Sequence, residues 1–287
     1  MKKRLFFVLL LTIMMLVSCK SETNKSQTEI SLEPGLYRNG ELVQSWEDLL
    51  TSVGYSDFGP SGTIEAKAER QSYFESCNGD LVLPNEVITI GNNAFFNCTS
   101  LTSVTIPKGV KILEYRAFED CEGLTSIIIP DGVESIGNHA FADCKNLSDI
   151  KISSSVKKFG IGTFYDTKWL ENKRQENPLV IINNVLIDGR TCESDVITIP
   201  DNVTGIACCA FQKNKNITSV IIPDSVKRIE EYAFDRCSNL TNITIPNSVT
   251  EIDGMSFYSC DNLTIYGDTE SYAKQYASEN DIHFESL

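Results

Sequence analysis

A phenylalanine recurs every 23 residues through most of this chain, and this period constrains the fold more than any other feature of the sequence. The recurring residues fall in two blocks, first Phe95, Phe118, Phe141 and Phe164, then Phe211, Phe234 and Phe257. The blocks are 47 residues apart, which is one period plus a unit that is one residue longer. A fixed period of about 20 to 50 residues is typical of solenoids, in which each unit stacks on the next. The period therefore favours an extended binding surface over a catalytic cleft.

One repeat unit contains a strand pattern, a proline and a compact turn. The unit that starts at Leu101 opens with L-x-x-V-x-I, a spacing and composition typical of a short strand. Pro107 ends this strand because it removes the next backbone donor. Val110 and Leu113 form a second apolar pair, and the stretch 117–121 indicates one turn of α- or 3₁₀-helix. A lone unit buries too little to fold, so the units stand only as a stack.

The predicted fold is therefore a repeat solenoid of the leucine-rich-repeat type, mainly β with short helical or 3₁₀ turns. It should contain about eight coils and a cap at each end. Because strand side chains alternate between two faces, one set of strand positions is predicted to face outward on one sheet. This set is the candidate binding face: Ser103, Thr105, Ser126, Ile128, Asp149, Lys151, Ser219, Ile221, Asn242 and Thr244.

The cysteines of the repeat occupy one interchangeable position. The slot three residues after the recurring phenylalanine holds Cys98, Cys121, Cys144, Cys237 and Cys260, and in the other two units it holds Thr167 and Asn214. A slot that accepts Cys, Thr or Asn requires a small side chain that can bond backbone polar groups. The pattern favours a ladder of free, buried thiols over disulfides. The redox state of Cys77, Cys192, Cys208 and Cys209, which lie outside this ladder, is left open.

The N-terminal segment is predicted to be an export signal and not part of the fold. Residues 1–18 combine a basic start with an apolar run too short to span a bilayer before a cleavage site. The sequence Leu16-Val17-Ser18-Cys19 resembles a bacterial lipobox, which implies cleavage before Cys19 and lipid attachment to its thiol. Residues 19–33 are predicted to be a flexible tether. The expected location is the outer membrane, lipid-anchored, with the surface favoured and the periplasmic leaflet left open.

Three segments depart from the repeat. Residues 34–80 are predicted to form an N-terminal cap that contains a hairpin at Asn39-Gly40 and a helix that starts near Ser45, and residues 263–287 form a C-terminal cap. In the C-terminal cap, Ser271 should cap a short helix that places Tyr272 and Tyr276 on one buried face. The longer unit, 167–195, carries a hairpin signal at Asn183-Asn184. It is either a longer coil that keeps the stack continuous or a protruding binding element.

The repeated pattern LTSVTIPKGVKILEYRAFEDC resembles the BspA-like, or Treponema-type, leucine-rich repeats of surface proteins in Bacteroidetes and spirochaetes. The resemblance covers about residues 81–262. It implies a cell-surface lipoprotein that mediates protein–protein interaction or adhesion, to host matrix or to other microbes. Family members share no catalytic residues, so none is transferred to this chain.

Composition and motifs argue against several other functions. The net charge of −14 disfavours nucleic acid as a partner, and only the N-terminal lipid is expected to contact a membrane. The two histidines suggest neither a metal nor a cofactor site, and His139 lies in a variable slot that should face solvent. An extracellular protein or glycan is the expected ligand. A glycan-binding accessory in outer-membrane nutrient capture is the alternative, followed by an enzyme, which would need a deep pocket, and by a purely structural role.

Overall fold

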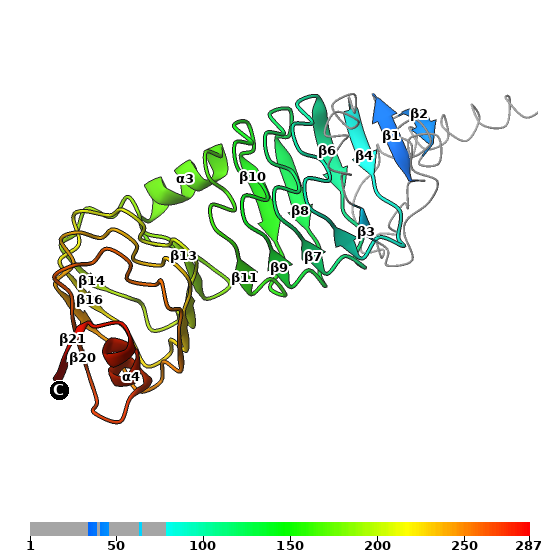
Figure 1. Ribbon diagram of the computed structural model, residues 1–287. Helices are drawn as coiled ribbons and strands as arrows, with labels where there is room; N and C mark the ends of the chain where they lie inside the picture. The colour runs from blue at the N-terminus through cyan, green and yellow to red at the C-terminus, as the bar shows by residue number, and fades with distance from the viewer. Residues whose placement is uncertain (1–33, 39–40, 46–62, 65–78) are drawn as a thin grey trace, which may run out of the picture. The chain divides into compact units, whose positions relative to one another are not determined.

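A computed structural model describes residues 34–38, 41–45, 63–64 and 79–287, all within the compact unit 33–287. Each coil has two short strands and a turn segment, so the solenoid has three faces (Figure 1). The predicted repeat solenoid is confirmed. We divide it into an N-terminal stack (79–166), a junction unit (167–195) and a C-terminal stack (196–287).

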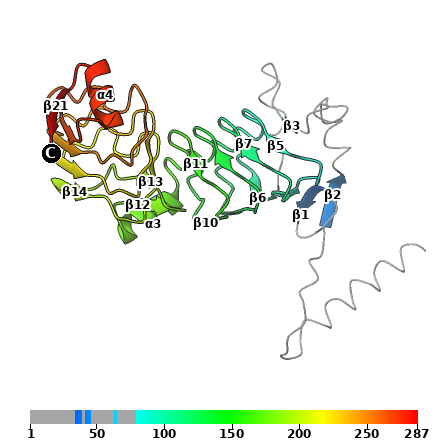
Figure 2. The same cartoon turned by 90° about the horizontal axis from the view of Figure 1, so that it is seen from below.

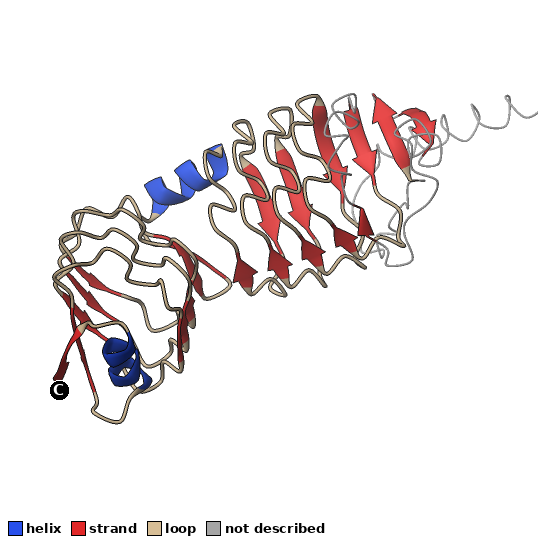
Figure 3. Ribbon diagram, in the orientation of Figure 1, coloured by secondary structure: helices blue, strands red, loops and turns tan. Residues whose placement is uncertain are grey.

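The first face is built from the strands that begin each repeat, and they pair in parallel at the repeat spacing. In the N-terminal stack they are β4 (Gly79–Val82), β6 (Leu101–Thr105), β8 (Ser126–Ile129) and β10 (Asp149–Ile152), paired β4 with β6 and β8 with β10. In the C-terminal stack they are β14 (Val196–Thr198), β16 (Ser219–Ile221), β18 (Asn242–Thr244), β20 (Thr264–Gly267) and β21 (His283–Ser286), which form one sheet. Figure 3 shows both sets in red.

The segment around the second apolar pair of each repeat forms another ladder of strands. The apolar pair was predicted from the sequence, but the strand was not. The first sheet of this ladder joins β3 (Thr63–Ile64), β5 (Thr89–Ile90), β7 (Ile112–Leu113), β9 (Ser135–Ile136) and β11 (Lys158–Phe159). Its second sheet joins β12 (Val180–Ile182), β13 (Val185–Asp188), β15 (Gly205–Ile206), β17 (Arg228–Ile229) and β19 (Glu251–Ile252).

The third face is a series of tight turns, which have the i→i−3 hydrogen bonds of the expected 3₁₀ turn but form no continuous helix. Hydrogen bonds from Cys121 N–H to Phe118 O (3.3 Å) and from Leu124 N–H to Cys121 O (3.1 Å) are of the tight i→i−3 kind. A continuous helix is excluded because Arg116 and Asp120 have positive φ, 55° and 61°. The freed N–H groups bond the next coil instead, as Phe118 N–H does to Ala140 O at 2.8 Å.

The recurring phenylalanines form two columns of stacked rings inside the solenoid. Neighbouring ring centroids lie 5.0–5.9 Å apart with nearly parallel planes, and the rings are buried: Phe95, Phe118, Phe141 and Phe164 in one column, Phe211, Phe234 and Phe257 in the other. Two hydrophobic clusters follow the two columns and meet at the junction unit. The hydrophobic core is therefore continuous along each stack, and one cluster ends and the other begins at the junction unit.

The slot three residues after each phenylalanine confirms the predicted thiol ladder. The Cys121 thiol donates to Phe95 O at 3.0 Å, and Cys144, Cys237 and Cys260 make the equivalent bond. Among the described residues every cysteine is free, including Cys192, Cys208 and Cys209, whereas Cys77 lies outside them. In the other two units Thr167 Oγ1 donates to Phe164 O and Asn214 bonds backbone carbonyls. The slot therefore satisfies backbone groups of the coil stack.

Both ends of the solenoid carry extra elements. At the N-terminal end β1 (Gly35–Arg38) pairs antiparallel with β2 (Glu41–Ser45) and with β4, so the predicted hairpin covers the edge of the first coil. The predicted helix that follows Ser45 lies outside the described residues. At the C-terminal end, α4 (Tyr272–Glu279) starts at Ser271, whose side chain accepts from Lys274 N–H. Ala273, Tyr276 and Ala277 are buried, whereas Tyr272, the first residue of the helix, is 37% exposed.

Candidate functional site: the outward strand face and the junction

The ten side chains predicted as a binding face all reach solvent. Ser103, Ser219, Asn242 and Thr244 are half-buried, and the other six are exposed, with Ile128 at 60% and Ile221 at 44%. The prediction that they share one sheet is wrong. The junction unit interrupts the first-face strands, so Lys151 ends one face at β10 and Ser219 belongs to another that begins at β14. The protein presents two outward faces, one on each stack.

The outward positions form two rows on each face. The strands pair without a register shift from β8 to β10 and from β14 to β20, whereas β6 and β8 keep the 23-residue spacing but belong to separate sheets. In the N-terminal stack one row runs Ser103, Ser126, Asp149 and the other Thr105, Ile128, Lys151. In the C-terminal stack one row runs Val196, Ser219, Asn242, Thr264 and the other Thr198, Ile221, Thr244, Tyr266. Near the start of the N-terminal rows, Asp80 accepts hydrogen bonds from Thr102 and Ser103, both at 2.7 Å.

The junction unit begins with a helix that ends the first phenylalanine column. Helix α3 (Lys168–Glu176) is capped by Thr167, whose hydroxyl accepts from Leu170 N–H at 3.2 Å. Trp169 and Leu170 are buried, and the Trp169 ring lies 4.7 Å from the Phe164 ring. Helix α3 takes the chain positions at which the next first-face strand would fall. This is the physical reason that the outward face is interrupted.

The hairpin signal at Asn183-Asn184 is confirmed. Both residues have positive φ (51° and 66°), and β12 pairs antiparallel with β13 across them. Strand β13 then pairs in parallel with β15. The hairpin therefore starts the second-face ladder of the C-terminal stack and does not protrude. The other alternative was a longer coil that keeps the stack continuous. The strand ladders do not continue through the junction unit, because in the described chain β11 does not pair with β12, and β10 does not pair with β14.

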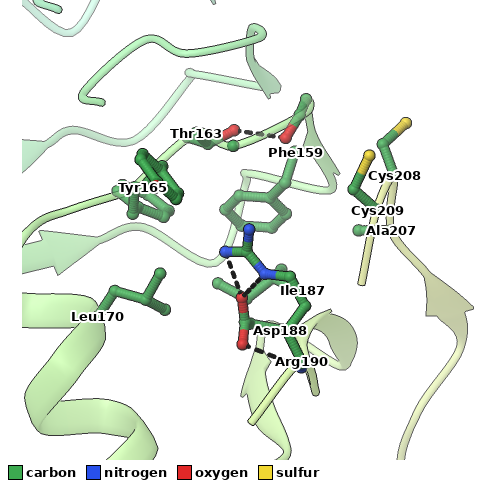
Figure 4. A pocket seen from close by; sticks show the side chains of 13 residues that line it. Phe159, Thr163, Tyr165, Leu170, Ile187, Asp188, Arg190, Ala207, Cys208 and Cys209 are labelled. Atoms are coloured by element: carbon green, nitrogen blue, oxygen red, sulfur yellow. Dashed lines mark hydrogen bonds and ion pairs between the residues drawn. The ribbon is translucent and has the colours of Figure 1, made fainter. Parts of the chain in front are cut away.

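A buried carboxylate lies beside the phenylalanine position of the junction unit, which Gly189 occupies: Gly189 N–H donates to Ala210 O, the bond that the recurring phenylalanine makes in other coils. This carboxylate belongs to Asp188, whose side chain is 2% exposed. Arg174 from α3 donates to both its oxygens, at 3.0 and 2.9 Å. Arg190 Nε donates to the same carboxylate at 2.7 Å (Figure 4). Two guanidinium groups thus neutralise one carboxylate, which compensates the cost of burying it. This site was not identified from the sequence, because the period changes in the junction unit: β13 pairs with β15 at a spacing of 20 residues instead of 23.

The pocket beside this cluster is too small for an organic ligand. Phe159, Tyr165 and Arg190 are among the residues that line it (Figure 4). Its cavity volume is ≈ 20 Å³. That volume accommodates about one water molecule. The Arg190 guanidinium also lies 5.7 Å from the Tyr165 ring centroid, a cation–π distance. This pocket is therefore a packing feature of the junction.

The titratable groups near the junction are not activated for catalysis. Burial and the Glu230 carboxylate, which lies 3.4 Å from the Cys208 thiol, raise the pKa of Cys208. Burial raises the pKa of Cys209 to about 11, which disfavours its thiolate. His139 is half-buried and not solvent-facing as expected, and burial, with the nearby Arg116 charge, lowers its pKa. In the described part of the chain, no cluster of three or more His, Cys, Asp or Glu side chains could hold a metal ion.

Sequence comparison defines the class of protein that this geometry represents. A sequence model of the BspA type leucine rich repeat region matches residues 69–191 and 189–271, more than half of the chain, with six copies. The chain therefore belongs to the BspA-type leucine-rich repeat family, as the repeat pattern predicted. Leucine-rich repeat proteins generally bind protein ligands, and solenoids of this family are typically non-enzymatic.

Solved structures with similar sequences are leucine-rich repeat proteins. A T. pallidum leucine rich repeat protein is 25% identical over 72% of this chain and 85% of its own, with a TM-score of 0.35. One from Bacteroides ovatus is 21% identical (72% and 83% covered, TM-score 0.31). A leucine rich cell surface protein from Faecalibacterium prausnitzii is 22% identical (69% and 81%, TM-score 0.28). Among curated proteins, none matches.

The two helices that the structure describes are short. Neither they nor any other described segment forms a helix with the length and apolar character needed to cross a bilayer.

Proposed function

We propose that this protein is a lipid-anchored surface protein that binds another protein through its outward strand faces, as an adhesin does. The observation that carries the proposal is the pair of faces, each with two in-register rows of solvent-accessible side chains on a rigid ladder. A rigid sheet presents many side chains without a large loss of conformational entropy on binding, which favours macromolecular ligands. The family's role in protein–protein interaction supports the same conclusion.

The anchor in this proposal is Cys19. The lipobox-like sequence before it supports lipid attachment, and the chain from residue 20 to 33 gives the solenoid a tether. Several acyl chains on one residue would provide durable anchoring, at about 0.8 kcal/mol per buried methylene. The proposed location is the outer surface of the outer membrane.

Two measurements on the full chain test this function. Protease treatment of intact cells should remove the solenoid, and a Cys19→Ala variant should lose membrane association. The wild-type protein in detergent should bind immobilised matrix proteins or partner bacterial cells, and the double variant Ile128→Arg/Ile221→Arg should bind at least tenfold more weakly, because it places a charge on each face. A protein that resists proteolysis on intact cells, or a double variant that binds normally, contradicts the proposal.

A further inference from the structure

The two outward faces differ in charge. The rows of the N-terminal stack include Asp149 and Lys151. The rows on the first four strands of the C-terminal sheet contain no charged residue: Val196, Thr198, Ser219, Ile221, Asn242, Thr244, Thr264 and Tyr266. The rows end on the last strand, β21, with His283 and Glu285, whose side chains lie 3.3 Å apart. In a chain that is 22% charged, exposed positions normally carry most of the charges, so an uncharged strip on the surface is unexpected. Depletion of charge is the compositional signal of the centre of a protein interface.

Carboxylates border this uncharged strip where its strands end. Asp201 and Asp224 follow the prolines that end β14 and β16, and Asp268 and Glu270 follow β20. All four side chains are exposed. Lys227 donates to the Asp224 backbone carbonyl at 3.1 Å, which leaves the Asp224 carboxylate without an ion pair among the described residues. This border is therefore an acidic edge that faces solvent.

The equivalent border of the N-terminal stack has a mixed composition. The residues that follow its strand-ending positions are Asn85, Lys108, Asp131 and Ser154. The matching positions of the C-terminal stack are Asp201, Asp224, Asn247 and Asp268, three carboxylates against one. The edge is therefore more acidic in the C-terminal stack, where it accompanies the uncharged strip. The combination of an uncharged centre and a charged margin is the anatomy of a protein interface.

The size of the strip indicates that the border takes part in binding. Strands spaced about 4.8 Å apart, with outward residues about 6.6 Å apart along each strand, give the strip an area on the order of 200 Å². A partner in a stable complex buries roughly 800 Å². The contact must therefore extend over the edges of the strip, and on this side the edge is acidic.

We infer that the outward face of the C-terminal stack docks a protein whose uncharged contact region is bordered by lysine or arginine side chains. This inference rests on the proposed function and adds the face and the partner's charge. An uncharged polysaccharide would gain nothing from the carboxylate border, and a nucleic acid would be repelled by it. Opposite charges at the rim accelerate association and select the partner, while the uncharged centre supplies most of the affinity.

The test uses a matched pair of substitutions at equivalent positions of the two faces. Ile128 and Ile221 occupy the same row of their stacks, and both are exposed. The full-length protein in detergent is panned against a phage-displayed library of random peptides. The inference predicts enrichment of peptides with Lys or Arg beside an uncharged centre. Ile221→Arg should weaken their binding at least tenfold, whereas Ile128→Arg should leave it unchanged.

The border is tested separately with Asp224→Asn, which should weaken binding about two- to fivefold, with a loss that shrinks at high salt. Thr244→Arg provides a second strip variant in case Ile221→Arg does not fold, as judged by circular dichroism. A neutral β-glucan serves as the non-protein probe. Glucan binding that Ile221→Arg abolishes and Asp224→Asn does not change overturns the inference. If only Ile128→Arg weakens binding of the selected peptides, the inference is overturned and the proposed function is supported. If neither isoleucine variant weakens their binding, both the inference and the proposed function are contradicted.

Discussion

In the N-terminal stack the phenylalanine column ends on Trp169 of α3, 4.7 Å from Phe164, and in the C-terminal stack it ends on Tyr276 of α4, 5.8 Å from Phe257. In both places a short helix with a hydroxyl N-cap, Thr167 or Ser271, closes the column. The last ring of a stack has no neighbour in the next coil, so an aromatic side chain must cover it. Helix α3 therefore closes a stack inside the chain, as α4 does at the end of the other stack.

The difference between the stacks lies on their surfaces and at their boundary. The N-terminal face mixes Asp149 and Lys151 with uncharged residues, whereas the C-terminal face is uncharged on its first four strands and has an acidic edge. Between them, Gly189 stands where the other coils have a phenylalanine, and its neighbour Asp188 is held by two arginines. The comparison teaches that the period fixes the core of each stack and leaves the outward rows and the boundary free to diverge.

The largest effects are expected from deleting a ring inside either column. Phe118 and Phe234 each stack on rings at both sides, with centroids 5.0–5.3 Å away. Phe118→Ala and Phe234→Ala should each lower the free energy of unfolding by about 3–5 kcal/mol, because each leaves a cavity. Urea-induced unfolding, followed by circular dichroism, measures both. A cost for one variant that is less than half of the other would show that the two columns are not equivalent.

Breaking the junction should separate the two stacks. Asp188→Asn leaves the Arg174 and Arg190 guanidinium groups without their shared carboxylate, at a cost of about 3 kcal/mol, the lower end for buried pairs because both arginines partly reach water. We expect the variant to unfold in two steps, one for each stack, in differential scanning calorimetry. Asp149→Asn, at an exposed position, is the control and should stay within about 0.5 kcal/mol of wild type. A single unchanged transition for Asp188→Asn contradicts a junction held by this carboxylate.

The slot after each phenylalanine should matter more at the junction than within a stack. Asn214 Nδ2 donates to Gly189 O (3.0 Å) and Cys192 O (2.9 Å), whereas the Cys144 thiol makes one bond, to Phe118 O. Asn214→Ala should therefore cost about 2–3 kcal/mol, since it removes two donors to buried carbonyls and the Oδ1 atom that accepts from Asn216 and Ile217 N–H. Cys144→Ala should cost about 1 kcal/mol. The same urea titrations compare them. Equal costs would mean that the asparagine has no special role at the boundary.

The smallest effect is expected from pH, and only in the N-terminal stack. Burial and the Arg116 charge lower the pKa of His139 below its usual 6.5, against a smaller opposing effect of Asp143. The unfolded chain then binds more protons between the two pKa values, so this contribution to stability is complete above about pH 6.5 and is lost as pH falls through the folded pKa. His139→Asn, which copies Asn93 of another coil, should remove this dependence. Identical pH profiles of the two proteins in urea unfolding would contradict it.

Much of the core could be predicted from the sequence, because every coil repeats the same requirement. The first-face strands, the thiol slot, the hairpin at Asn183-Asn184 and the Ser271 cap follow from local patterns that satisfy backbone groups or bury apolar side chains within one unit. The hydrogen bonds between coils in the turn segment, which the positive φ of Arg116 and Asp120 permits, could not be predicted because they have no signature in a single unit.

The sequence by itself determined the period, the coil and the buried columns, since these depend on spacing and on residue type. The division of the outward rows into two faces was decided only by tertiary structure. It depends on how α3 fills the place of a strand and on how Arg174 and Arg190, distant from each other along the chain, meet at Asp188. The Arg174–Asp188 contact spans 14 residues and is charged, so its free energy depends on burial and geometry that no local pattern records.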